Sequence, residues 1–401
     1  MTSRLPPVRT AFDFSPHMPE NAVFMGKVLP PWRRWQAIAP LRLNEMASNS
    51  RFSSPCGRVI IHRAAVNAEM GMLFDWAGLT DRTTPLIYET DEECLAIARR
   101  ESAAGASILA NHLSPAGNID GVNWLNAAAL IARFNNKARL DDWAPAAHIP
   151  PRTIAPPREA FKAILTQQKP FVLKAATGMT NGGGSAVRIC ASAEEGEAAL
   201  ASFLETDSDL AEVVIEERQL FKATWCANLA IVETAVHYLG GAMQAMTETF
   251  QHTGNFYGAG CAPPQALEDL ALEIGEKARA AGYRGIAGMD AGLTEDGRVL
   301  VYDLNFRTNA CTQQLLLHDS ASARIGAATS RGLRAEFSIP LGEVVSKIED
   351  LVKSGRFLPL SAFDYGLYGG EKTQGGALYG VAFGNSMEDC QSLADKLQQL
   401  G

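Results

Sequence analysis

Paired metal-binding and nucleotide-binding motifs are scarce in this sequence. Its seven cysteines are scattered without a CxxC pair, which argues against a zinc knuckle and against a disulfide framework. The seven histidines show no HExxH or similar paired spacing. No early strand is followed by GxGxxG, so a nicotinamide-dependent dehydrogenase is the weakest of the readings.

Long apolar runs and excess positive charge are also missing. Nowhere do about 18 apolar residues follow one another, and Arg4 and Arg9 precede no apolar segment, so neither membrane insertion nor secretion is expected. A net charge of -8 disfavours binding to nucleic acid, which needs a basic surface. The basic and aromatic run at 30–35 (PPWRRW) is interpreted as a loop against a lobe surface. We expect a cytoplasmic protein in a reducing compartment.

The chain is long enough for two or three lobes, with 401 residues of which 47% are hydrophobic. In the first third, strand-like segments at 58–64, 85–88 and 107–113 alternate with a helix that begins near Thr90 or Asp91, which predicts a β/α lobe. Residues 121–144 are predicted to be helical with a break at the two asparagines, and 149–157 form a proline-rich connector.

The remainder predicts mixed α+β structure. A helix at 158–167, a strand at 170–176, a glycine-rich loop, a strand at 185–190, a helix capped by Ser192 and a strand at 212–217 follow in turn. The end of the chain predicts a strand and then a helix capped by Ser386. We expect a β/α lobe over 1–135, a central lobe over 136–222 and a third lobe over 223–401.

Two strands in the last third carry the sharpest group of polar residues. The segments GIAGMDAGLT and RVLVYDLNFR are joined by EDGR, in which Asp-Gly is a strong hairpin signal. Strand alternation places Asp303, Asn305 and Arg307 in one row, and Asp290 lies on the partner strand. Oxygen ligands beside a guanidinium suit magnesium and phosphoryl transfer. A solvated hairpin with an ordinary ion pair is the alternative.

Two earlier segments could bind a nucleotide. In FVLKAATGMTNGGGSAVRIC, Lys174 ends a strand, and Gly182, Gly183, Gly184 and Ser185 form a loop whose backbone N–H groups could approach phosphates. A flexible hairpin tip is the alternative, and the loop lacks the ending of a Walker motif. In EVVIEERQL, Glu217 and the Leu220 backbone could bind adenine, whereas Glu216 could equally be a solvated acid that closes the strand.

Together these segments resemble the ATP-grasp superfamily over roughly 134–307. The order carries the resemblance: a lysine in FNNKARL (Lys137), the strand with Lys174 and its glycine loop, the acids of IEE, and then GMD and YDLNFR. The family usually has Glu-x-Asn-x-Arg in the last motif, so Asp303 stands where a longer glutamate is common. The resemblance implies a three-lobed ATP-grasp architecture in which 1–135 is the pre-ATP-grasp lobe.

The resemblance also implies a role for each site residue. Lys137, Lys174 and the glycine loop would hold the phosphates of ATP, Glu217 and Leu220 the adenine, and Asp290, Asp303 and Asn305 one or two Mg2+ ions. Arg307 would steady the transferred phosphoryl group. Thr308, Asn309 and Thr312 follow directly and either contact substrate or cap the next helix.

The implied activity is ATP-dependent ligation of a carboxylate to an amine through an acyl phosphate, with an amino acid or small peptide as substrate. Its partners would be small molecules, and a homodimer is compatible with the sequence. An intramolecular, lactam-forming synthetase uses the same chemistry. An ATP-binding sensor without ligase activity is a third reading, because Asp303 departs from the usual glutamate.

Overall fold

The computed structural model describes residues 5–36, 38–113, 119–179, 181–182, 184–247, 252–368 and 374–400. The first part of the chain forms a four-stranded parallel sheet in the order β4-β3-β1-β5. The predicted β/α character of this lobe is confirmed. Its strands are β1 (Val23–Met25), β3 (Arg58–His62), β4 (Thr84–Tyr88) and β5 (Ile108–Ala110). Its helices are α1 (Pro40–Ser48), α2 (Ala68–Ala77) and α3 (Asp91–Ala103), the last opened by a Thr90–Glu93 capping box.

The helix expected over 121–144 is shorter in the structure. Only α4 (Ala128–Asn135) is α-helical, and a 3-10 segment (Lys137–Asp142) follows the break at Asn136. Gly121 has a φ of 79°, which ends regular structure there, and Trp124 instead bridges to Ile108 of β5. The predicted break at the asparagines is therefore present, whereas the first part of the predicted helix, before Ala128, is not helical.

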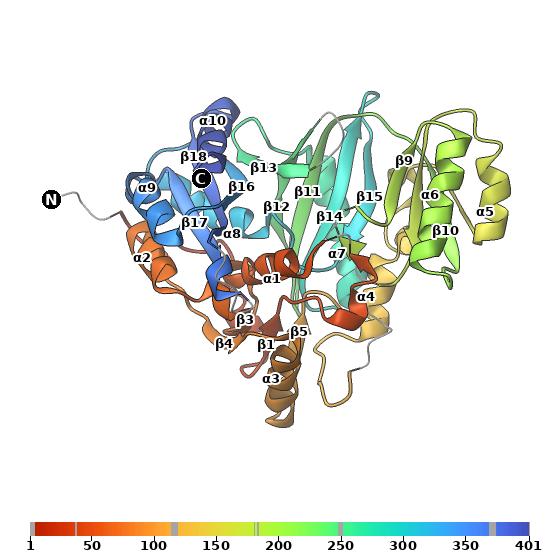
Figure 1. Cartoon of the computed structure of the whole chain (residues 1–401). Helices are drawn as coiled ribbons and strands as arrows, with labels where there is room; N and C mark the ends of the chain where they lie inside the picture. Colours follow the sequence, from red (N-terminus) through yellow and green to blue (C-terminus); the bar gives the residue numbers. More distant parts are fainter. Residues whose placement is uncertain are drawn as a thin grey trace.

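The central lobe is a small antiparallel sheet with two helices, and it projects to one side in Figure 1. The strand order is β6-β10-β7-β9. The strands are β6 (Arg152–Ala155), β7 (Phe171–Ala176), β9 (Val187–Cys190) and β10 (Glu212–Glu217), and the helices are α5 (Pro157–Ile164) and α6 (Ala193–Thr206). The Ser192 hydroxyl accepts from the backbone N–H of Glu195, so the predicted cap of α6 is present.

A strand from the N-terminal part of the chain joins this central lobe. β2 (Trp35–Gln36) pairs in parallel with β8 (Asn181–Gly182) in the glycine loop. Trp35 is buried in the core of the central lobe, where its ring meets Phe203 edge to face at 5.7 Å. Arg34 forms an ion pair of 2.8 Å with Asp207 of the same lobe. The two tryptophans of the basic and aromatic run, Trp32 and Trp35, are therefore core residues, so the expectation of a loop against a lobe surface is wrong for them.

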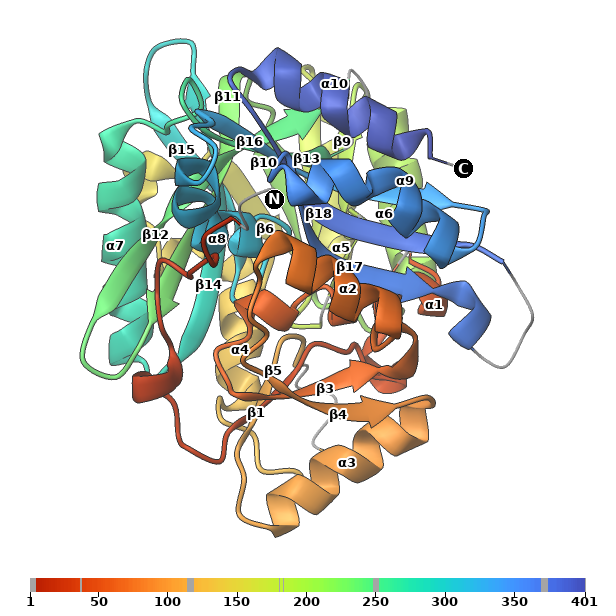
Figure 2. The ribbon, with the colours of Figure 1, turned by 90° about the vertical axis from the view of Figure 1, so that its left-hand side faces the viewer.

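The third part of the chain is built on an eight-stranded sheet in the order β15-β14-β11-β12-β13-β16-β18-β17. The strands are β11 (Phe221–Ile231), β12 (Val236–Met246), β13 (His252–Gly258), β14 (Gly285–Thr294), β15 (Val299–Asn305), β16 (Thr329–Phe337), β17 (Phe357–Asp364) and β18 (Gly376–Gly384). The helices are α7 (Gln265–Ala280), α8 (Thr312–Ala323), α9 (Leu341–Lys353) and α10 (Met387–Gln398), with Ser386 at the predicted cap. Figure 2 shows α9 and α10 beside β17 and β18.

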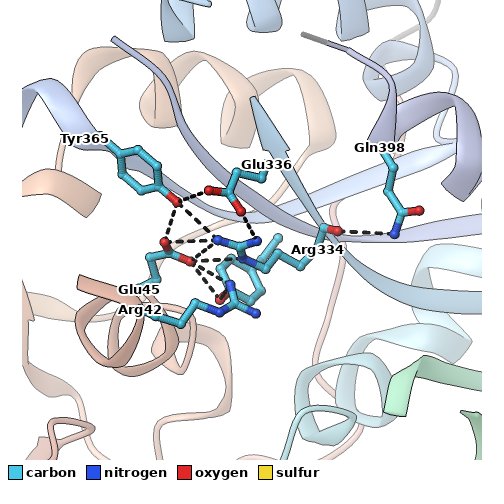
Figure 3. A network of polar contacts seen from close by, with 7 residues as sticks. Arg42, Glu45, Arg334, Glu336, Tyr365 and Gln398 are labelled. Atoms are coloured by element: carbon cyan, nitrogen blue, oxygen red, sulfur yellow. Dashed lines mark hydrogen bonds and ion pairs between the residues drawn. The ribbon is translucent and has the colours of Figure 1, made fainter. Parts of the chain in front are cut away.

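Polar contacts connect α1 of the first lobe to β16, β18 and the 3-10 turn after β17 (Figure 3). Glu45 is almost fully buried and accepts from Arg334 at 2.9 Å, from Arg42 at 2.7 Å and from the Tyr365 hydroxyl at 2.6 Å. Tyr379 of β18 also contacts Glu45, at 3.3 Å. Two guanidinium groups thus balance one buried carboxylate.

Among the residues that the structure describes, no helix has the length and apolar character needed to cross a membrane.

Candidate active site

The predicted hairpin is present and brings its polar residues together. β14 and β15 are antiparallel neighbours in which Asp290 lies directly opposite Asp303, and Gly288 opposite Asn305. The Asn305 side chain donates to Asp290 Oδ2 at 3.1 Å. A register shift follows Asp290, which marks a local irregularity in the pairing beside these carboxylates. Two carboxylates and one amide therefore share one end of the hairpin.

Residues from other strands orient Asp290, and sequence reasoning did not identify them. Gln244 of β12 donates through Nε2 to Asp290 Oδ1 at 3.0 Å, while its Oε1 accepts from the Tyr302 hydroxyl at 3.0 Å. The Cys226 thiol of β11 is a further hydrogen-bond partner of this carboxylate. Burial and the neighbouring negative charge of Asp303 raise the pKa of Asp290 to about 6. A cation at this position would relieve both effects.

Two buried lysines face the hairpin. Lys137 Nζ lies 2.7 Å from Asp303 Oδ1. Lys174 Nζ donates to the backbone oxygen of Tyr302 at 2.9 Å and forms an ion pair of 2.6 Å with Glu216. Burial lowers the pKa of Lys174, an effect that the nearby Glu216 charge opposes. The central lobe therefore places its strand lysine against β15, next to Asp303.

Arg307 lies in a bend after β15 ends at Asn305, so the prediction that it extends the strand row is wrong, although its side chain returns to Asn305. Its Nη2 donates to Asn305 Oδ1 at 2.8 Å, and its Nη1 donates to the Thr308 backbone oxygen at 3.3 Å and to Asn309 Oδ1 at 3.4 Å. These contacts hold the guanidinium beside the two carboxylates. An anionic phosphoryl or carboxylate group would find a preorganised bidentate donor there.

The two acids that close β10 differ in their surroundings. Glu216 is 3% exposed and paired with Lys174, so the alternative that it is a solvated acid is wrong, and a role in nucleotide binding remains a prediction. Strand alternation sends Glu217 outward, where its side chain is exposed and its backbone N–H donates to Pro151 at 2.8 Å. The Leu220 side chain is 68% exposed. A role of Glu217 and Leu220 in adenine binding remains a prediction.

The glycine loop is tied to β2. Gly182 pairs with Gln36, and the Ser185 hydroxyl donates to the Trp35 backbone oxygen. Gly184 has a φ of 72° and open space around its α-carbon, a conformation that favours glycine. Gly183 lies outside the described residues.

The three polar residues after Arg307 are used to hold the chain in place. Asn111, from the end of β5, accepts through Oδ1 from the Thr308 N–H at 2.7 Å and from its hydroxyl at 2.8 Å. Thr312 accepts from the Asn309 N–H at 2.7 Å. The expected helix cap is not formed, because Cys311 is the N-cap residue of α8 and makes no side-chain capping bond. Substrate contact by these residues stays untested.

The residue types at the hairpin fit magnesium. Among the described residues no cluster of three or more His, Cys, Asp or Glu side chains could hold a metal ion alone. Asp290 and Asp303 lie opposite each other with the Asn305 amide beside them, which supplies hard oxygen donors in a partial set. Magnesium characteristically completes such a partial set with water and phosphate oxygens.

Comparisons with known proteins agree with this arrangement. Residues 150–305 match a family described as ATP-grasp, L-aspartate–L-methionine ligase. N5-carboxyaminoimidazole synthetase from Staphylococcus aureus, in complex with ADP, superposes with a TM-score of 0.57 at 9% identity, covering 94% of this chain and 96% of that one. Biotin carboxylase from Campylobacter jejuni, in a β-γ-ATP complex, gives a TM-score of 0.54 at 12% identity, covering 93% of this chain and 89% of that one.

A third structure covers nearly the whole of both chains. The N5-carboxyaminoimidazole ribonucleotide synthetase from Thermus thermophilus is 13% identical, covers 94% of this chain and 98% of that one, and has a TM-score of 0.53. These similarities extend the likeness from the matched segment to the complete three-lobed architecture. Residues 150–305 therefore match an ATP-grasp family, and the chain has the ATP-grasp fold.

Proposed function

We propose that this protein is an ATP-dependent carboxylate-amine ligase that forms an amide or peptide bond through an acyl phosphate and releases ADP and phosphate. The observation that carries the proposal is the hairpin. Asp290, Asp303 and Asn305 lie together beside Arg307, with Lys137 and Lys174 opposite. This combination of hard oxygen ligands and buried cations suits transfer of a γ-phosphoryl group.

The matched family supports an amino acid as substrate. Its description names ligation of L-aspartate to L-methionine. The similar solved structures include biotin carboxylase and carboxyaminoimidazole synthetases. We infer an amino acid or small peptide as the acid, with a small-molecule amine as acceptor. Cellular placement in the cytoplasm belongs to the same proposal.

In the first step, a carboxylate oxygen of the acid attacks the γ-phosphorus of ATP, and the bond to the bridging oxygen of ADP breaks. Lys137 and Lys174 would bind the phosphates, and their present partners Asp303 and Glu216 would exchange part of that contact for nucleotide oxygens. Arg307 would hold the equatorial oxygens of the transferred group. Magnesium held by Asp290, Asp303 and Asn305 would supply charge neutralisation at the phosphates.

In the second step, the amine nitrogen attacks the acyl carbon, loses a proton and expels phosphate. Holding the acyl phosphate and the amine in one site makes this step effectively unimolecular. The central lobe and its glycine loop would shield the intermediate from water. The contacts of this loop with β2 would hold it in position.

One observation favours a second candidate, an ATP-binding sensor that does not ligate. Asp303 is shorter than the glutamate that this position often carries, and in the structure it is paired with Lys137. The sensor would bind Mg-ATP without acid-dependent turnover.

A lactam-forming synthetase, which uses the same ATP chemistry, would differ from the proposed ligase in needing only one organic substrate.

A substrate screen tests the proposal. Purified protein is incubated with Mg-ATP and pools of amino acids and small carboxylates, and ADP, AMP and phosphate are measured separately. The ligase predicts ADP and phosphate only when an acid and an amine are both present. Release with a single substrate that carries both groups would identify the lactam-forming enzyme. Nucleotide binding without any acid-dependent release would identify the sensor and refute the proposal.

A further inference from the structure

The N-terminal parallel sheet has a topological switch point that faces the candidate active site. In the order β4-β3-β1-β5, the chain passes from β1 to β3 and β4 on one side and returns to place β5 on the other. In open parallel sheets, ligands bind outside the carboxyl ends of the strands at such a point. Asn111 and His112 follow the end of β5, and the Asn111 N–H donates to Met25 at the end of β1 at 2.8 Å.

Hydrogen bonds with Thr308, which directly follows Arg307, fix the orientation of the Asn111 amide. Its Oδ1 accepts from the backbone N–H of Thr308, which can only donate. The Nδ2 group of Asn111 therefore points the other way, where it lies 3.4 Å from Nε2 of His112. An amide NH2 can only donate, so Nε2 of His112 is the acceptor in this contact.

This orientation also fixes the tautomer of His112. With Nε2 accepting, the neutral ring carries its hydrogen on Nδ1. Nδ1 is buried and has no hydrogen-bond partner within the part of the chain that the structure describes. Burial, together with the Arg307 charge, lowers the pKa of His112 to about 3, so the ring is neutral at neutral pH. A buried N–H without an acceptor is unfavourable, and an incoming oxygen would offset that cost.

Other polar groups at these strand ends are already satisfied. Lys27, which follows β1, pairs with Asp91 at 2.6 Å and donates to Asn44 at 2.5 Å. The His62 ring at the end of β3 accepts from the Ala64 N–H at 3.0 Å and contacts the Glu89 backbone oxygen at 3.1 Å. Among the described residues, His112 Nδ1 is a buried donor without a partner, and Asn111 connects the His112 ring to Thr308, the residue that follows Arg307.

We propose that His112 is a specificity-determining residue whose Nδ1–H donates to an anionic oxygen of the acid substrate, together with the Arg307 guanidinium. This assignment rests on the proposed ligase function. It makes the switch point of the first lobe part of the acid-binding pocket, and it predicts an acid that carries an oxygen within reach of both donors. A neutral donor beside a fixed cation recognises a carboxylate without adding a second positive charge.

Two substitutions at this position separate substrate binding from a structural role. Asparagine places an amide N–H close to the position of Nδ1, whereas leucine fills similar space without a donor. We expect His112→Leu to raise the KM for the acid at least about tenfold, the factor that corresponds to about 1.4 kcal/mol. We expect His112→Asn to recover most of that loss, and the KM for ATP to stay unchanged in both. His237→Leu, at an exposed histidine of β12, is the matched control.

The assay uses the full chain, Mg-ATP and the acid found by the substrate screen, with L-aspartate as the first acid tried. Thermal stabilisation by Mg-ADP is measured in every variant, and equal stabilisation shows an intact nucleotide site. An unchanged KM for the acid in His112→Leu would overturn the assignment, as would equal losses in the leucine and asparagine variants. Absence of acid-dependent ADP release from the unmodified protein would instead refute the ligase function, and the assignment with it.

Discussion

We propose that single side chains at the β14–β15 hairpin decide whether a divalent cation can bind. Asp303 contacts Lys137, whereas Asn305 contacts both Asp290 and Arg307. Asp303 and Asn305, the proposed metal ligands, thus contact Lys137 and Arg307, the positively charged side chains proposed to bind phosphate. Replacing either should affect turnover far more than folding, because both lie at the edge of the core rather than within it.

Asp303→Asn and Asn305→Ala test this assignment. We expect each to lower kcat by at least about a hundredfold, the scale seen when a preorganised charge-stabilising group is removed. Circular dichroism and thermal unfolding should remain close to those of the unmodified protein. Asp296→Asn, in the exposed turn of the same hairpin, is the control and should keep full activity. Retained turnover in both site variants would refute their role as metal ligands.

His62 provides a test of pH dependence away from the active site. Its Nδ1 accepts from the Ala64 N–H, so Nε2–H donates to Glu89, and burial lowers its pKa from 6.5 to about 4. The unfolded chain therefore takes up a proton first as pH falls. The stability from neutral His62 is complete above about pH 6.5 and is lost progressively towards pH 4, on the order of 3 kcal/mol in total.

The comparison uses His62→Gln, which retains an Nε2 donor and does not titrate. Free energies of unfolding are measured by urea denaturation from pH 7.5 to pH 4 in both proteins. We expect the advantage of the unmodified protein over the variant to shrink as pH falls. A constant difference across this range would show that His62 is not held neutral by the fold.

At the scale of elements, β2 is the least expected part of the architecture. Two residues, Trp35 and Gln36, connect the first third of the chain to the glycine loop of the central lobe. Trp35 also fills the core of that lobe, and its Nε1 donates to Asp207 at 3.3 Å. The central lobe thus depends on a segment that lies more than a hundred residues earlier in the sequence.

Trp35→Ala should therefore destabilise the central lobe. Removing a buried tryptophan side chain costs about 3–5 kcal/mol. We expect increased protease sensitivity within 150–217 and a higher KM for ATP, because the glycine loop loses its neighbour. Arg34→Ala is the control, since its side chain is half exposed and its ion pair with Asp207 contributes little. Equal protease resistance in Trp35→Ala and the unmodified protein would contradict this account.

The hairpin could be predicted from sequence because its signals are local. Asp-Gly fixed the turn, and strand alternation then placed Asp303 and Asn305 in one row. Gln244 and Cys226 could not be found this way, because they reach Asp290 only through the order β14-β11-β12 in the sheet. β2 has only two residues, too few for any periodic pattern. Sequence alone left Glu216 open between binding and a solvated position, because its partner Lys174 lies across a strand pairing.

At the scale of the whole molecule, the first lobe and the C-terminal strands are joined by a buried charge. Glu45 of α1 is enclosed by Arg42, Arg334 and the hydroxyl of Tyr365 (Figure 3), and the Tyr379 hydroxyl also contacts it. Burying ions costs several kcal/mol, so the cluster contributes to stability only while it is complete. Removing one partner leaves a charge without compensation.

Arg334→Met should lower the free energy of unfolding by about 3–5 kcal/mol, because it leaves Glu45 buried with a single guanidinium partner. Adding Glu45→Leu to Arg334→Met should recover much of this loss. A double-mutant cycle measured by urea denaturation gives the coupling between the two residues. If the two single effects simply add, the carboxylate and the guanidinium act independently and the cluster does not join the lobes.

The central claim, acyl-phosphate formation by a carboxylate that attacks ATP, is tested most directly by isotope transfer. The acid substrate is labelled with 18O in its carboxylate and incubated with the enzyme, Mg-ATP and the amine, and the products are analysed by mass spectrometry. We predict that each phosphate released carries one 18O atom from the acid, with ADP unlabelled. Label in AMP, with unlabelled pyrophosphate in place of phosphate, would contradict the account.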